Sequence, residues 1–219
     1  MKAWRLAAVL SCAVLAGCGG LLRSDTPAPL AYQLRAGGGS ALSPTVAIDL
    51  AVLRPLARPG LDSDAIAVWL PDRRFDAYAA SRWSAPLPDL VQSLLLDDFR
   101  AREAFERVLT DRGQFRGRYW LQTEIRDFQA EYAREGEAPR VRVTLRGEIG
   151  RVAERRALGS IVGRGEVQAA SNRLRDVTAA FEQAYAQAAV TLTAGVHAAV
   201  LAAERTSAPA PTPESTKAP

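Results

Sequence analysis

Few residues of this 219-residue chain carry side chains that could do chemistry. It has one histidine, His197, and two cysteines, Cys12 and Cys18, so the side chains that build zinc sites, nucleophilic triads and disulfide frameworks are scarce. The sequence contains no Gly-x-Ser-x-Gly, His-Glu-x-x-His or Gly-Lys-Ser/Thr motif, the usual signatures of hydrolases, metalloproteases and NTPases. We therefore predict no enzyme activity, catalytic residue, metal site or cofactor.

Three further candidates are better explained without chemistry. Asp97 and Asp98 are adjacent in a segment of helical period, where neighbours do not face each other as residues three or four apart do, so we interpret them as a solvated helix edge. His197 lies among Ala and Val and is interpreted as a satisfied or partly exposed imidazole. The glycine run 37–39 has no lysine and no predicted helix after it, and a turn is the better interpretation.

Cys18 has the most specific chemical context. Lys2 and Arg5 precede an apolar run from Leu6 to Leu15, which is shorter than the roughly 20 residues that cross a bilayer and is typical of an export signal. Leu15-Ala16-Gly17-Cys18 resembles the bacterial lipobox, in which the thiol receives a diacylglyceryl group, the signal is cut before the cysteine and the new amino terminus is acylated, for instance with palmitate. We predict a lipoprotein signal peptide at residues 1–17 and lipidation of Cys18. The alternative is an ordinary secretory signal with an incidental cysteine.

The anchor also predicts a location. One acyl chain binds membranes only marginally, whereas the two or three chains of a lipoprotein hold a protein on a bilayer. Gly19 replaces the aspartate that retains enteric-type lipoproteins in the inner membrane, so this resemblance implies an outer-membrane anchor facing the periplasm. Residues 18–30 are rich in Gly, Pro and small residues, and we expect a flexible lipidated tether that reaches about 40 Å when extended.

Composition and charge bound the rest of the chain. The formal charge of +4 includes Lys2 and Arg5 of the predicted signal, so the mature chain is only weakly basic. Its arginines are interspersed with Asp and Glu, which gives no support to nucleic-acid binding. Residues 206–219 contain four prolines among Ala, Ser and Thr and are predicted to be a disordered tail. One folded domain at residues 31–205 remains.

The domain shows both kinds of hydrophobic period. Alternating segments at residues 46–52, 66–70, 121–126 and 141–149 predict strands with one buried face, and the glycine-rich segment 158–168 is a further candidate. Helical period predicts helices from Pro88 to about Arg100 and from Leu174 to Glu204, the second after a cap at Ser171 or Asn172. This order predicts an α+β fold with an antiparallel-rich β-sheet covered on one face by two helices.

Two sets of surface candidates keep two interpretations each. Aromatic side chains suit both lipid contact and packing, and we favour packing in the core or on strands for Trp69, Trp83 and Trp120. Arginine side chains could meet acidic lipid headgroups or a partner's carboxylates, or could be simple solvated turns. This applies to two pairs, Arg73 with Arg74 and Arg116 with Arg118.

Several segments in order resemble the ABC-type transport auxiliary lipoprotein family, the PqiC-like proteins. They span almost the whole predicted mature domain, beginning at the lipobox and ending with an Ala-rich terminal helix. The matching segments are Tyr32-Gln33-Leu34, which opens the first strand, the strand Val46 to Val52, the segment Tyr78 to Leu87, which carries the family's Arg-Trp-x-x-Pro pattern at Arg82 to Pro86 and leads into the first helix, and Leu121 to Phe128, which ends in Asp-Phe. The glycine run and the proline-rich tail are not part of the family pattern.

The resemblance implies a non-enzymatic accessory of an MCE-type lipid transport system, with an MCE-domain protein and its ABC transporter complex as partners. The lipoprotein would dock the periplasmic MCE assembly at the outer membrane. MCE assemblies are rings in this resemblance, so we hypothesise that the domain forms a homo-oligomer or binds in several copies. The alternatives are a periplasmic lipid or hydrophobic-ligand binding module, with a cavity between helices and sheet, and an outer-membrane assembly lipoprotein.

Overall fold

The structure, a computed structural model, describes residues 28–111, 117–154 and 156–207. The predicted signal peptide, Cys18, most of the predicted tether, Arg116 and residues 208–219 lie outside this part of the chain. The strands of the described part are β1 (Leu30–Tyr32), β2 (Val46–Val52), β3 (Leu56–Ala57), β4 (Ala65–Trp69), β5 (Phe75–Trp83), β6 (Phe105–Thr110), β7 (Tyr119–Glu131), β8 (Arg140–Arg151) and β9 (Arg156–Gln168). The helices are α2 (Leu87–Ala101) and α3 (Leu174–Ser207).

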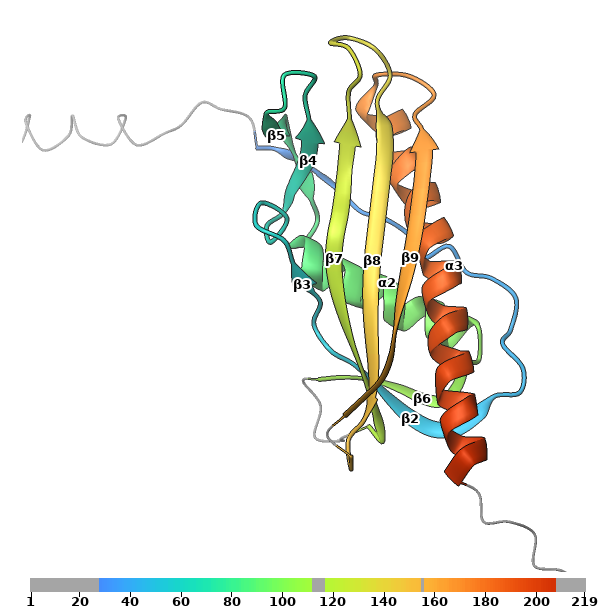
Figure 1. The fold of residues 1–219 in the computed structure, drawn as a ribbon. Helices are drawn as coiled ribbons and strands as arrows, with labels where there is room; N and C mark the ends of the chain where they lie inside the picture. Colours follow the sequence, from blue (N-terminus) through green and yellow to red (C-terminus); the bar gives the residue numbers. More distant parts are fainter. Residues whose placement is uncertain (1–27, 112–116, 155, 208–219) are drawn as a thin grey trace, which may run out of the picture.

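The long strand β7 organises the sheet (Figure 1). One of its edges pairs antiparallel with β8, which in turn pairs antiparallel with β9. Its other edge pairs in parallel with three earlier strands, with β2 near its start, β3 near its middle and β4 at its end. The outer strands β6, β5 and β1 then extend these additions, because β6 pairs with β2, β5 with β4, and β1 with β5.

The predicted α+β fold is confirmed, but the prediction of an antiparallel-rich sheet is wrong because the sheet is mixed. Pairings of β7 with β2, β3 and β4 are parallel, as are those of β2 with β6 and β1 with β5. Alternation along a strand reports which face is buried and carries no information on the direction of its neighbour. Parallel neighbours need a crossover connection. The chain between β2 and its parallel neighbour β6 contains α2, which lies just before β6.

Both helices lie against the same face of the sheet (Figure 1). α2 starts with Pro88 in its first turn, carries Asp89 near its positive end and buries Leu90, Val91 and Leu95, as its helical period predicts. α3 has 34 residues and is therefore about 51 Å long. It is long and apolar enough to cross a membrane, yet a helix that buries one face in a protein core meets the same criterion, and α3 packs along β8 and β9.

Three aromatic side chains fill the space between the sheet and α3. Trp83 of β5 packs edge-on against Phe128 of β7 at 6.0 Å and Phe181 of α3 at 5.1 Å between ring centroids. Phe128 and Phe181 stack on each other at 5.3 Å. All three side chains are fully buried. Edge-to-face and stacked aromatic pairs at these separations are favourable beyond the area that they bury, so this cluster joins the two sides of the core.

Two glycines let α3 lie flush on β9. A Cβ atom added at Gly163 would lie 2.0 Å from the carbonyl oxygen of Ala188, and one at Gly165 would lie 1.9 Å from that of Ala184. Both obstacles are helix backbone, so no side-chain rotation could relieve them. The glycines in this strand are therefore a packing requirement, and the small residues of α3 are their counterpart.

Candidate functional site

One end of the sheet presents an exposed aromatic pair on a tight turn. The turn joins β4 to β5, and the Leu70 amide donates to the Arg74 carbonyl at 2.9 Å. It holds Trp69, the last residue of β4, against Phe75, the first of β5, with ring centroids 5.5 Å apart in an edge-on arrangement. Trp69 is 39% exposed and Phe75 40% exposed, which is high for large aromatic side chains and marks them as candidates for binding.

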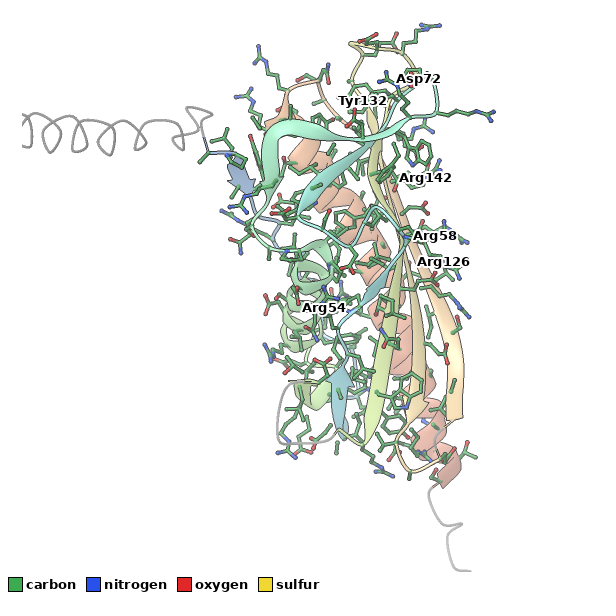
Figure 2. All side chains as sticks on the ribbon, turned by 90° about the vertical axis from the view of Figure 1, so that its left-hand side faces the viewer. Arg54, Arg58, Asp72, Arg126, Tyr132 and Arg142 are labelled. Atoms are coloured by element: carbon green, nitrogen blue, oxygen red, sulfur yellow. The ribbon has the colours of Figure 1, made fainter. Side chains whose placement is uncertain are left out.

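The residues that follow β7 and precede α3 complete this end of the molecule. Figure 2 shows Tyr132, which follows β7, close to Asp72 of the β4–β5 turn. Four cavities open here, among the described residues, with volumes of about 260, 350, 480 and 270 Å³. We call this surface the hairpin end and define it by Trp69, Leu70, Phe75, Asp76, Tyr78, Tyr132, Glu135 and Asn172.

The 260 Å³ cavity has mostly apolar walls, and three of its polar lining residues, Tyr78, Tyr132 and Asn172, are joined by hydrogen bonds. The hydroxyls of Tyr78 and Tyr132 are 2.8 Å apart, and the Tyr132 hydroxyl donates to Oδ1 of Asn172. Burial, with the bond to Tyr132 as a second cause, raises the pKa of Tyr78, so its hydroxyl stays neutral. Two carboxylates, Asp76 and Glu135, also line the cavity, and the other lining residues are short or apolar: Val68, Leu70, Ala77, Ala79 and Gly136.

The 480 Å³ cavity lies on the sheet face that no helix covers. It runs from Trp69 and Leu70 to Asp127, Glu131 and Arg142. Arg142 bonds Glu131 at 3.2 Å and Glu166 of β9 at 2.9 Å, and these carboxylates outweigh partial burial and raise the pKa of its guanidinium. Figure 2 shows Arg58, Arg126 and Arg142 along this face. Exposed ion pairs of this kind contribute little to stability. Their charged side chains make this face polar and solvated.

The structure separates the three tryptophans that the sequence singles out. Trp69 is exposed at the hairpin end and Trp83 is fully buried in the core. Trp120, half-buried at the start of β7, covers Gly150 of β8, where an added Cβ would lie 2.3 Å from its ring. Core or strand packing is therefore confirmed for Trp83 and Trp120, whereas Trp69 projects to solvent.

The arginine pairs also separate. Arg73 and Arg74 lie in the exposed β4–β5 turn, where Arg74 bonds Asp72. Arg118 lies just before β7 at the opposite end of the sheet and bonds Glu204 of α3 at 2.9 Å. Arg116 lies outside the described residues.

Asp98 corrects one interpretation made from the sequence. Asp97 is exposed, as expected, but Asp98 is fully buried. Its carboxylate accepts from the Tyr185 hydroxyl of α3 at 2.7 Å and from the Gly38 amide at 3.2 Å, and burial raises its pKa. Adjacent helix residues point in different directions, so one of the two faces the core while the other faces water. Asp98 therefore ties α2, α3 and the glycine run together.

His197 is satisfied, as the sequence suggested. It is 6% exposed and its Nε2 lies 2.9 Å from the Pro44 carbonyl oxygen. In the part of the chain that the structure describes, no group of three or more His, Cys, Asp or Glu side chains could hold a metal ion. Phe75, Tyr78 and Tyr132 were not among the candidate site residues from the sequence. The turn residues Pro71 and Asp72, which follow the alternating segment 66–70, are the signal that could have located the hairpin.

Comparison with known proteins identifies the family. The family model for the ABC-type transport auxiliary lipoprotein component matches residues 32–193. Among curated proteins, none matches the chain. A crystal structure of a DUF330-family protein from Xanthomonas campestris is 22% identical, with a TM-score of 0.67, over 82% of this chain and 98% of that one.

Two more remote structures share parts of this fold. That of an uncharacterized protein is 13% identical, with a TM-score of 0.57, over 78% of this chain and 99% of that one. A PelC dodecamer from Paraburkholderia phytofirmans is 16% identical, with a TM-score of 0.44, over 72% and 94%, and this similarity is too remote to bear on assembly here. The first two neighbours support the fold. The family model, which covers most of the described domain, shows that this chain belongs to the ABC-type transport auxiliary lipoprotein family.

Proposed function

We propose that this chain is a lipid-anchored, non-enzymatic accessory of an MCE-type ABC lipid transport system. It docks the periplasmic MCE assembly at the outer membrane through the hairpin end. The observation that carries the proposal is the exposed Trp69–Phe75 pair beside a small apolar cavity on a domain whose family is an auxiliary transport component. Exposed aromatic side chains surrounded by a polar rim are the usual composition of a protein–protein contact.

The size of the cavity favours docking over carriage of a lipid. Pockets for drug-sized ligands measure about 300–1,000 Å³, and a diacyl lipid is larger still, whereas the apolar cavity at the hairpin end measures about 260 Å³. A carrier would need a longer cavity between sheet and helices. Trp83, Phe128 and Phe181 occupy that space in this domain. A single large side chain of a partner fits the cavity better than a transported lipid.

The anchor of the proposed accessory is Cys18, with the signal peptide at residues 1–17 removed. Gly19 after the cysteine supports the outer membrane, with the domain facing the periplasm. A tether at residues 18–30 would leave the domain free to turn its hairpin end towards a partner. Tethering raises the effective concentration of the domain near an assembly that spans the periplasm, so a weak individual contact can suffice, and several copies would strengthen it.

Affinity purification after mild crosslinking of the tagged, membrane-anchored protein tests this function. We expect an MCE-domain protein among the crosslinked partners. A matched control keeps the signal, Cys18 and residues 18–30 but lacks the folded domain, and it should recover no such partner. Recovery of no MCE or ABC component by the full chain would refute the docking role. Phospholipid retained by a purified Cys18→Ser chain would instead favour the lipid-binding module.

A further inference from the structure

The rim of the 260 Å³ cavity carries charge of one sign. Asp76 of β5 and Glu135 of the β7–β8 connection line the cavity, and no Lys, Arg or His does. Asp76 accepts a hydrogen bond from its neighbour's amide, the Ala77 N–H, at 2.8 Å. Within the described residues, neither carboxylate has a basic group within ion-pair distance. The cavity therefore combines apolar walls with an acidic rim.

Two arginines that neighbour the rim residues along the chain, Arg74 and Arg134, bond other carboxylates. Arg74 faces both rim carboxylates from the turn but bonds Asp72 through Nε. Arg134 bonds Glu137 at 3.2 Å. On the uncovered sheet face, by contrast, acidic residues have arginine partners: Glu124 with Arg126, and Glu131 and Glu166 with Arg142. The rim carboxylates Asp76 and Glu135 thus differ from these three paired carboxylates of the uncovered face.

We propose that this cavity receives one apolar side chain from a segment of a partner protein in which Lys or Arg flanks that side chain. The inference rests on the proposed docking function and names the chemistry of the partner. The apolar side chain enters between Leu70 and Tyr78, its basic neighbour meets Asp76 and Glu135, and Trp69 with Phe75 packs beside the segment. A buried anchor in a pocket supplies most of the affinity of such contacts, and rim charges speed and orient the encounter.

The same charge disfavours a membrane lipid as the occupant. A phospholipid that inserted an acyl chain here would bring its phosphate group towards two carboxylates, and these like charges would repel each other. A peptide with a basic residue next to its apolar side chain has the complementary sign. The protein segment is therefore the occupant that both the volume and the charge of the cavity favour.

Site-specific photocrosslinking in cells tests this inference on the full-length lipidated protein. A photoreactive residue replaces Ala79, which lines the cavity, and in the control it replaces Val190, which is exposed on α3. We expect crosslinks from position 79 but not from position 190. Mass spectrometry of the crosslinked peptide should find an apolar residue next to Lys or Arg. A crosslink to phospholipid, or to a segment without a basic residue, would overturn the proposal.

Two variants separate charge from shape. Asp76→Asn with Glu135→Gln removes the rim charge and should lower the crosslinking yield about fivefold and weaken its dependence on salt. The matched control, Asp97→Asn with Glu106→Gln, removes two exposed charges away from the cavity and should change neither. Ala79→Phe, which fills the cavity, should abolish recovery of the partner while circular dichroism shows an intact fold.

The outcomes distinguish this inference from the proposed function. If an MCE protein is recovered equally by the wild type and by both cavity variants, docking stands and the cavity is not its site. If position 79 crosslinks a basic, apolar segment of a protein outside the MCE and ABC components, the chemistry of the site stands and the transport role fails. No crosslink at position 79, with unchanged partner recovery, overturns the inference alone.

Discussion

The flush contact between β9 and α3 makes Gly163 a sharp test of the fold. Replacing Gly163 by Ala adds a Cβ that would lie 2.0 Å from the carbonyl oxygen of Ala188. Since real Cβ contacts stay above 3.0 Å, the helix must move away by about 1 Å or the strand must bend. Overpacking of this kind costs about 1–3 kcal/mol, so we expect the free energy of unfolding to fall by about 2 kcal/mol.

The matched control is Gly159→Ala in the same strand. An added Cβ at Gly159 meets nothing within 4 Å, and Ala is favoured over Gly in a strand by about 0.5–1 kcal/mol, so this variant should be neutral or slightly more stable. Urea titrations followed by circular dichroism, on mature chains carrying Cys18→Ser, measure both. The corresponding change in Tm for Gly163→Ala is a fall of about 4–8 °C. Equal stability of the two variants would refute flush packing of α3 on β9.

Three further predictions concern a buried acid, the end of α3 and the anchor. Burial raises the pKa of Asp98, so the folded protein loses stability relative to the unfolded chain as the pH rises from the unfolded pKa to the folded pKa. In Asp98→Asn this loss should be absent. Urea titrations at acidic and neutral pH measure the free energy of unfolding of both proteins, and a difference between them that does not change with pH would contradict the prediction. Arg151 bonds the Ala203 carbonyl and Glu204, both at 3.3 Å, so Arg151→Met should speed amide exchange in the last turns of α3 about tenfold, and unchanged exchange would show that the helix end is held otherwise. Cys18→Ser should move the protein from the membrane to the soluble fraction on cell fractionation, and a membrane-bound variant would mean that Cys18 is not the anchor.

Much of the secondary structure could be predicted from hydrophobic period. Residues 46–52 form β2, and the alternating segments at 121–126 and 141–149 lie within β7 and β8. Both helices begin near their predicted starts, because the proline of α2 and the apolar face of α3 are local signals. Hydrophobic period did not predict the short strands β1 and β3, nor β5 and β6, because their side chains do not alternate clearly between core and water.

The candidate site was harder to predict because it has no motif. The sequence points to Trp69 only as one of three tryptophans. These lie apart in the structure, with Trp83 in the core and Trp120 and Trp69 at opposite ends of β7. Tyr78 and Tyr132 meet only through the fold, across 54 positions of sequence. The acidic rim has the same origin, since Asp76 belongs to β5 and Glu135 to the β7–β8 connection, and the two share a cavity only after β4, β5 and β7 have paired.

The sequence by itself determined the alternating strands, the two helices and the family to which the chain belongs, and it predicts an export signal that ends before Cys18. These features depend on residues close together in the chain or on their order along it. Tertiary structure alone decided the mixed sheet, the burial of Asp98 and the cavity at the hairpin end. Strand direction, burial of one of two adjacent carboxylates and the sign of charge around a cavity depend on which distant segments become neighbours, and hydrophobic period carries no record of that choice.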